Sequence, residues 1–317
     1  MTRTPILILL IIAVAGTFDL LLSPPDGAPS RDGSQIRRPD PQSFERRSSR
    51  NNQDRWMAPD RSSRRSSLAA PSVRDPGFTV AVPVAKGNSI GTAFSLDQRG
   101  VWMTARHVVD GCARVLIVTK PGRGVRVNRT YISRHADLAI LETRGGAPSV
   151  TFTQSSLQIG QTGYHFGYPN GKPAAVKSTL IGRRRMRSSG RYSVVEPVVA
   201  WTEQVRVPDT YGGLGGISGG PAFDSNGNII GVTVAGTKRR GRIYTTALTS
   251  VASALSEAGV SVDRGSGKDG RINNRNFSEV GADMRRKLTV ALVYCAAPGR
   301  QRRGGGINPR RPGLPPA

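Results

Sequence analysis

Residues 216–221 of this 317-residue chain read GISGGP, and a second glycine cluster, GGLG, precedes them at 212–215. Glycine permits a tight turn whose backbone N–H groups point toward one spot, because it has no Cβ atom to clash. A serine on such a turn can attack a carbonyl group, and the N–H groups can bind the oxyanion that forms. The motif therefore indicates that Ser218 is a nucleophile. The alternative that it leaves open is a glycine-rich turn with no chemistry.

A general base for this serine is offered by His107, which ends the stretch TARH at residues 104–107. Histidine suits proton transfer at neutral pH because its ordinary pKa is about 6.5. The chain has two other histidines, His135 and His165. We expect both to be structural.

An acidic partner for the histidine is offered by Asp137, which begins the stretch DLAIL at residues 137–141. A carboxylate at the head of a buried strand is costly without a partner, and the imidazole of His107 would be that partner. Taken alone, this aspartate could equally cap a strand. The order His107, Asp137, Ser218 is one of the few in which a catalytic triad occurs, so the three residues together favour the triad.

The pattern between these residues predicts an all-β fold. Short β-branched segments are separated by Gly, Asn and Asp, as in a sandwich or barrel. A helix is predicted over residues 251–258. The expected strands cover residues 78–84, 91–96, 101–104, 114–119, 138–142, 176–181, 194–199, 229–234 and 243–246.

Residues 77 to 258 resemble a trypsin-like peptidase domain of the bacterial HtrA/Deg kind. The matching stretches are GTAF at 91–94, TARHVV at 104–109, DLAIL at 137–141, FGYP at 166–169, ISGGP at 217–221 and GNIIG at 227–231. The resemblance implies two six-stranded, chymotrypsin-like β-barrels with a C-terminal helix and the triad in the cleft between them. His107 and Asp137 would lie on the first barrel and Ser218 on the second. The N–H groups of Gly216 and Ser218 would form the oxyanion hole.

The chain also departs from this family. HtrA proteins usually carry PDZ domains after the protease, and we expect none here. Trypsin-style zymogen activation needs an Asp before the catalytic serine, where this chain has Ile217, so we expect no such activation. Residues 183–211 are longer and more basic than expected, and we expect a mobile loop over the cleft.

Specificity is indicated by the residues expected around the cleft. Trypsin-like enzymes that cut after Arg or Lys have an Asp six positions before the serine, and this chain has Gly212 there. We therefore expect no cleavage after basic residues. The other expected walls are residues 211–217 and Val234, Ala235 and Gly236, which favour a small or medium apolar side chain. We expect no cofactor and no metal.

The chain divides into four predicted regions. Residues 1–22 are a signal peptide or membrane anchor, and residues 23–75 are a disordered linker rich in Arg, Ser and Pro. Residues 76–262 form the protease domain, and residues 263–317 form a basic, largely disordered tail. Within that tail, residues 283–297 could be a docking helix, a strand or an interfacial segment. We expect no structural disulfide between Cys112 and Cys295, which lie far apart in the sequence.

The formal net charge of +25 predicts attraction to polyanions without naming one. The sequence therefore predicts an exported serine endopeptidase with an envelope or protein-quality-control role, in the periplasm, outside the cell or anchored to a membrane. Its expected partners are protein or peptide substrates. The basic tails could add nonspecific contact with polyanions or anionic membranes, and we expect no specific nucleic acid. The alternative is a catalytically silent binding module with a protease fold, or a polyanion-binding protein.

Overall fold

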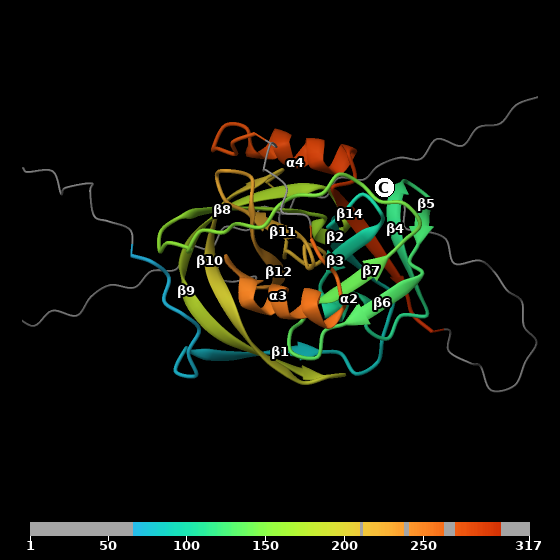
Figure 1. Ribbon diagram of the computed structural model, residues 1–317, viewed down its shortest axis with the longest axis horizontal. Coiled ribbons are helices and arrows are strands. Elements are labelled where there is room, and N and C mark those ends of the chain that lie inside the picture. The colour runs from blue at the N-terminus through green and yellow to red at the C-terminus, as the bar shows by residue number, and fades with distance from the viewer. Residues whose placement is uncertain (1–65, 210–211, 238–240, 263–269, 299–317) are drawn as a thin grey trace, which may run out of the picture. The chain divides into compact units, whose positions relative to one another are not determined.

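The computed structural model describes residues 66–209, 212–237, 241–262 and 270–298. These residues form two seven-stranded sheets flanked by helices (Figure 1). The all-β class is confirmed. The predicted signal or anchor segment and the predicted linker up to residue 65 lie outside the described residues, as do residues 263–269 and 299–317 of the predicted tail.

One sheet closes into a ring. Its order is β1-β9-β10-β13-β12-β11-β8, and a further pairing of β8 with β9 joins the ends of the six strands from β8 to β13. Closure leaves few unpaired strand edges, and it matches the barrel predicted to carry Ser218. The strands are β8 (Thr162–Gly167), β9 (Ala174–Gly190), β10 (Val194–Val207), β11 (Pro221–Phe223), β12 (Ile229–Thr237) and β13 (Arg242–Thr246).

Strand β1 (Gly77–Val82) lies outside this ring. It pairs in parallel with the second half of β9, from Gly77 opposite Arg185 to Val82 opposite Gly190. The first half of β9 pairs with β8 instead. A single long strand thus holds the ring closed and carries β1 beside it.

The other sheet is an open half-barrel with the order β5-β4-β14-β2-β3-β7-β6. The expected six strands become seven because β14, from the end of the described chain, lies between β2 and β4. The strands are β2 (Ser89–Ser95), β3 (Val101–Thr104), β4 (Arg114–Lys120), β5 (Arg123–Arg126), β6 (Arg129–Ile132), β7 (Ala139–Glu142) and β14 (Val290–Ala296).

The expected disordered tail is therefore wrong for residues 270–298. Helix α4 (Phe277–Arg286) covers the closed sheet (Figure 1). There the aromatic side chain of Phe277 packs on that of Tyr164 on β8, with their ring centroids 5.8 Å apart. Strand β14 is almost wholly buried. Of the three alternatives for residues 283–297, the structure has the end of a helix followed by a strand.

The expected absence of a disulfide is also wrong. Cys112 and Cys295 form a disulfide with their Cα atoms 5.6 Å apart. Because Cys295 lies on β14 next to β4, the tertiary fold brings together two thiols that are 183 residues apart in the sequence. Sequence distance alone could not reveal this.

Most of residues 183–211, expected as a mobile loop, belong to the long hairpin of β9 and β10. Exposed Arg185 and Arg187 alternate with buried Met186 and Ser188. This alternation is that of a strand with one face on the core. The many arginines concealed the pattern.

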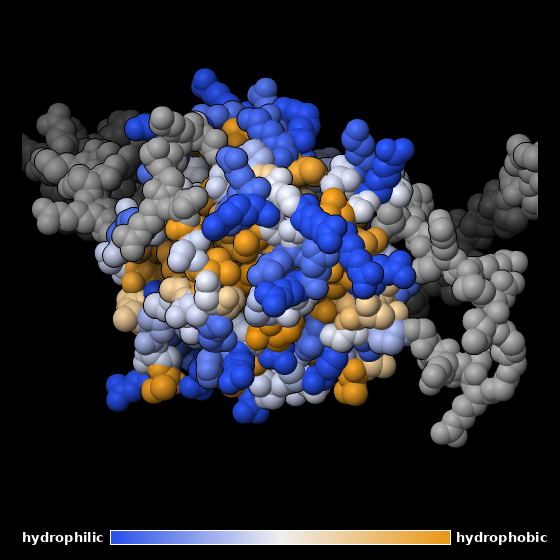
Figure 2. Space-filling view, turned by 45° about the vertical axis from the view of Figure 1, so that its right-hand side comes forward, coloured by the Kyte–Doolittle hydropathy of each residue, from blue (hydrophilic) through white to orange (hydrophobic). Residues whose placement is uncertain are grey.

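Three short helices complete the described fold. Helix α2 (Arg106–Val109) follows β3 directly, and η1 (Pro169–Gly171) follows β8. Helix α3 (Leu248–Glu257) is the helix predicted at 251–258, and it begins three residues earlier. The main core joins the two sheets, with Phe94 and Met103 from the half-barrel packed with Phe166 and Phe223 from the ring. On the face shown in Figure 2, hydrophilic side chains alternate with smaller apolar areas. None of the helices in the described residues is both long and apolar enough to cross a bilayer.

Candidate active site

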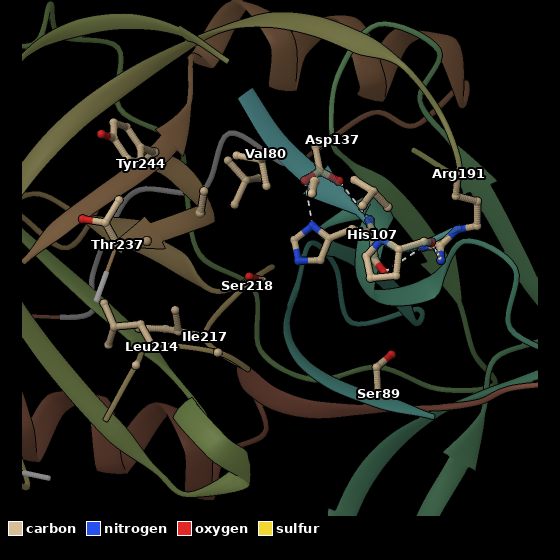
Figure 3. A pocket seen from close by; sticks show the side chains of 18 of the residues that line it. Val80, Ser89, His107, Asp137, Arg191, Leu214, Ile217, Ser218, Thr237 and Tyr244 are labelled. Atoms are coloured by element: carbon tan, nitrogen blue, oxygen red, sulfur yellow. Dashed lines mark hydrogen bonds and ion pairs between the residues drawn. The ribbon is translucent and has the colours of Figure 1, made fainter. Parts of the chain in front are cut away.

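A cleft of about 750 Å³ is lined by His107, Asp137 and Ser218 (Figure 3). Its walls come from both sheets, since His107 lies in α2 and Asp137 lies just before β7, whereas Ser218 lies between β10 and β11. The structure thus brings together in one cleft the three side chains that the sequence singled out.

The imidazole of His107 is held by Asp137 through two hydrogen bonds. The Nδ1 atom lies 2.7 Å from Oδ2 of Asp137, and the backbone N–H of His107 donates to Oδ1 over 2.9 Å. The Asp137 side chain is 4% exposed and the His107 side chain 29%. This arrangement fixes the tautomer in which Nδ1 carries the proton, so that Nε2 is free to accept one on the side of Ser218.

A second donor to the buried carboxylate is Tyr192, at the tip of the β9–β10 hairpin. Its hydroxyl donates to Oδ1 of Asp137 over 2.7 Å. Burial and the neighbouring Asp137 raise the pKa of Tyr192 well above its ordinary value, so the hydroxyl keeps its proton. The guanidinium of Arg106 lies 3.9 Å above the Tyr192 ring, which fixes that ring in place.

A second buried acid, Glu196, lies behind Asp137. Its Oε1 accepts the backbone N–H of Asp137 over 2.7 Å, whereas its Oε2 is buried without a partner among the described residues. Burial, and then the charge of Asp137, raise the pKa of Glu196 well above its ordinary value. Glu196 thus supports the backbone of Asp137, and its raised pKa favours the neutral form of the acid.

The turn that carries Ser218 is fixed from both sheets. Thr92 on β2 donates its N–H to the Ser218 carbonyl over 2.8 Å and its hydroxyl to the Gly216 carbonyl over 2.8 Å. Gly219 donates to Thr233 on β12 over 2.7 Å. Gly219 has a φ of +87°, and a Cβ atom there would lie 2.1 Å from the Thr92 carbonyl oxygen, so only glycine fits.

The N–H groups of Gly216 and Ser218 have no hydrogen-bond partner within the described part of the chain. The Gly215 carbonyl accepts the N–H of Asn170 over 2.5 Å. Because the peptide is planar and trans, the Gly216 N–H points the opposite way, away from Asn170. Gly216 has a φ of +100° and no room for a Cβ atom against the Tyr168 carbonyl. Both N–H groups therefore remain available as hydrogen-bond donors.

The cleft has apolar walls on two sides of the serine. Val234, Ala235 and Gly236 line it as expected, and so do Leu214 and Ile217. Gly212 does not line it, and its carbonyl accepts a hydrogen bond from Arg206 instead. Tyr211, the other expected wall residue, lies outside the described residues.

The two remaining histidines lie elsewhere. His135 is exposed and lines a separate depression beside α3. His165 is fully buried one layer behind the Ser218 turn, where its ring nitrogens contact Thr233 and Ser178. Burial lowers the pKa of His165 to about 3, so it stays neutral.

Several residues near the site were not found from the sequence. Tyr192 and Glu196 had no motif to mark them, and Lys86 is far from the triad in sequence. The Lys86 ammonium donates to the carbonyls of His107 and Val108 over 3.0 and 2.8 Å, at the end of α2. Burial, together with the charge of Arg191, lowers the pKa of Lys86 to about 8.

The signal that could have found Glu196 is an acid within the apolar run 194–200.

Comparison with known proteins identifies the same region. Residues 91–232 match the model of the trypsin-like peptidase domain. The Synechocystis sp. protein named "Putative serine protease HhoA" is 28% identical over 46% of this chain and 36% of its own length. The "Probable periplasmic serine endoprotease DegP-like" of Halomonas elongata is 30% identical over 45% of this chain and 29% of its own length. The chain thus spans about a third of these relatives.

Solved structures are more distant. The active form of the Rv3671c protease from M. tuberculosis is 21% identical, over 63% of this chain and 99% of that one, with a TM-score of 0.45. The HtrA-type protease AlgW is 18% identical, over 53% of this chain and 51% of that one, with a TM-score of 0.43.

Proposed function

Because residues 91–232 match the model of the trypsin-like peptidase domain, we propose that this protein is a serine endopeptidase with His107, Asp137 and Ser218 as its catalytic residues. The observation that carries the proposal is the shared cleft, in which a buried carboxylate orients the imidazole beside a serine on a constrained turn. The same constellation performs acyl transfer on unrelated folds, so it is recognised by its geometry.

The proposed reaction proceeds through an acyl-enzyme. His107 takes the proton of the Ser218 hydroxyl while the oxygen attacks the carbonyl carbon of a peptide bond. The N–H groups of Gly216 and Ser218 bind the oxyanion, and Asp137 stabilises the imidazolium that forms. The imidazolium then protonates the leaving amine. Water, activated in the same way, releases the acid and restores the serine.

We propose a small or medium apolar side chain on the residue before the scissile bond. Leu214, Ile217 and Val234 supply apolar walls, and no acidic side chain among the described residues other than Asp137 lines the cleft. A buried apolar wall that faces an Arg or Lys side chain would leave its charge unpaired, which is costly. Gly212, where a trypsin would place its aspartate, turns its carbonyl to Arg206.

We propose that the protein acts outside the cytoplasm, in an envelope or protein-quality-control role. The disulfide between Cys112 and Cys295 favours an oxidising compartment, and the Halomonas elongata relative is named as periplasmic. We further propose that the excess of basic residues attracts polyanions or anionic membranes without specificity. Such binding should disappear at moderate salt.

Cleavage-site profiling of the full chain on a peptide library tests the proposal, with Ser218→Ala as the matched control. The expected result is hydrolysis after small or medium apolar residues by the wild type and none by the variant. Hydrolysis by neither chain, with both folded, would favour the non-catalytic binding module. Equal hydrolysis by both would identify a contaminating protease.

A further inference from the structure

Strand β1 precedes the residues that match the peptidase domain, yet it forms one wall of the cleft. Along β1 the side chains of Phe78, Val80 and Val82 face the protein, while those of Thr79 and Ala81 are exposed. In Figure 3 the Val80 side chain lies between Tyr244 and Asp137, across Ser218 from Leu214 and Ile217. The cleft therefore has two opposed apolar walls, and one of them comes from β1.

Hydrogen bonds hold both ends of β1. Arg185 donates its backbone N–H to the Pro76 carbonyl over 3.0 Å, and Nη1 of Arg191 donates to the Pro83 carbonyl over 3.0 Å. The Phe78 ring lies 4.3 Å from the ring of Tyr244. Together with the six-residue pairing to β9, these contacts make β1 a fixed part of the cleft.

An extended peptide has a place to pair beside Ser218. Residues 235–237 of β12 pair only with β13, so their other edge is free within the described chain. A substrate can add to such an edge as one more strand, with its side chains alternating between two faces. One face would point toward Leu214, Ile217 and Gly236, and the other toward His107 and Val80.

We propose that Val80 determines which side chain the enzyme accepts at the second residue before the scissile bond. The residue immediately before that bond would place its side chain against Leu214 and Ile217. The side chain of the second residue before the bond would point to the other face, where Val80 is the apolar residue beside Asp137 and His107. This inference rests on the proposed endopeptidase function and assigns its second subsite to an apolar side chain of limited size.

The test compares two peptide substrates that differ only at that second residue, one with Ala and one with Leu. The measured quantity is the Leu-to-Ala ratio of kcat/KM, which does not depend on how much of a variant is folded. Changing an apolar pocket by a methylene-sized volume alters such ratios about tenfold. Val80→Ala should raise the ratio about tenfold, and Val80→Phe should lower it by a similar factor.

Val84→Ala is the matched control, because Val84 is 76% exposed and does not line the cleft. Its ratio should equal that of the wild type. Ratios unchanged in both Val80 variants, with wild-type hydrolysis intact, would overturn the inference and leave the proposed function standing. A wild-type chain that hydrolyses neither peptide nor any library member would contradict the proposed function and this inference with it.

Discussion

The hydroxyl of Tyr192 donates a 2.7 Å hydrogen bond to Oδ1 of Asp137, and this bond links a hairpin of one sheet to a loop of the other. Tyr192 comes from the tip of the hairpin on the ring, and Asp137 comes from the half-barrel. The tip also packs on β1, because Val82, Tyr192 and Val194 form one buried cluster. The Asp137 carboxylate, which orients His107, is thus positioned by a hairpin of the ring.

Tyr192→Phe should lower kcat about tenfold, because Asp137 loses a hydrogen bond that positions it against His107. A hydrogen bond to a charged group contributes about 1.5–3 kcal/mol, and its loss leaves the carboxylate, and through it the imidazole, less firmly positioned. KM should change little, since Tyr192 does not line the cleft. Tyr131→Phe is the control, because that hydroxyl accepts a hydrogen bond from Arg129 at an exposed position away from the triad. A kcat for Tyr192→Phe equal to that of the wild type would mean that its hydroxyl has no positioning role.

Glu196→Gln should retain activity within about threefold of the wild type, because a neutral acid and an amide can both accept the Asp137 N–H. The stability difference should depend on pH. Because the pKa of Glu196 is raised in the folded chain, its contribution to the free energy of unfolding is fully present below the pKa that Glu196 has in the unfolded chain. That contribution falls as the pH rises toward the raised pKa. Urea unfolding should therefore favour Glu196→Gln at pH 7.5 and show no such gain at pH 4. A pH-independent difference would contradict the raised pKa of Glu196.

Replacing both Cys112 and Cys295 by Ser should destabilise the chain by about 2–5 kcal/mol, the usual range for a native disulfide. The measurement is urea unfolding with and without a reductant. Reductant should weaken the wild type to the level of the double variant and leave that variant unchanged. Alkylation of both thiols in the oxidised, folded wild type would contradict the pairing.

The sequence predicted the parts of the fold whose signals are local. The glycines around Ser218, the apolar run before His107 and the strand after Asp137 each mark a turn or strand by their own composition. Strand β14 carried no such signal. Its residues are buried on both faces, so they lack the alternation of a strand, and its partners β2 and β4 lie some 170–200 residues earlier.

The residues that support the site escaped prediction for the same reason. Tyr192 follows a run of arginines, and its contact with Asp137 exists only because a long hairpin crosses to the other sheet. Val80 reads as an ordinary strand residue, and its place in the cleft depends on the pairing of β1 with β9. Local composition could predict neither the contact of Tyr192 with Asp137 nor the pairing of β1 with β9, because each joins segments that are far apart in the sequence.

The central claim is that Ser218 is a nucleophile activated by His107 and Asp137. Labelling of the full chain with a fluorophosphonate, followed by mass spectrometry of the adduct, tests it most directly. We predict one adduct on Ser218 in the wild type, none in Ser218→Ala and much slower labelling in Asp137→Asn. A folded wild-type chain that takes up no probe, or that takes it up equally after Ser218→Ala, would contradict the account.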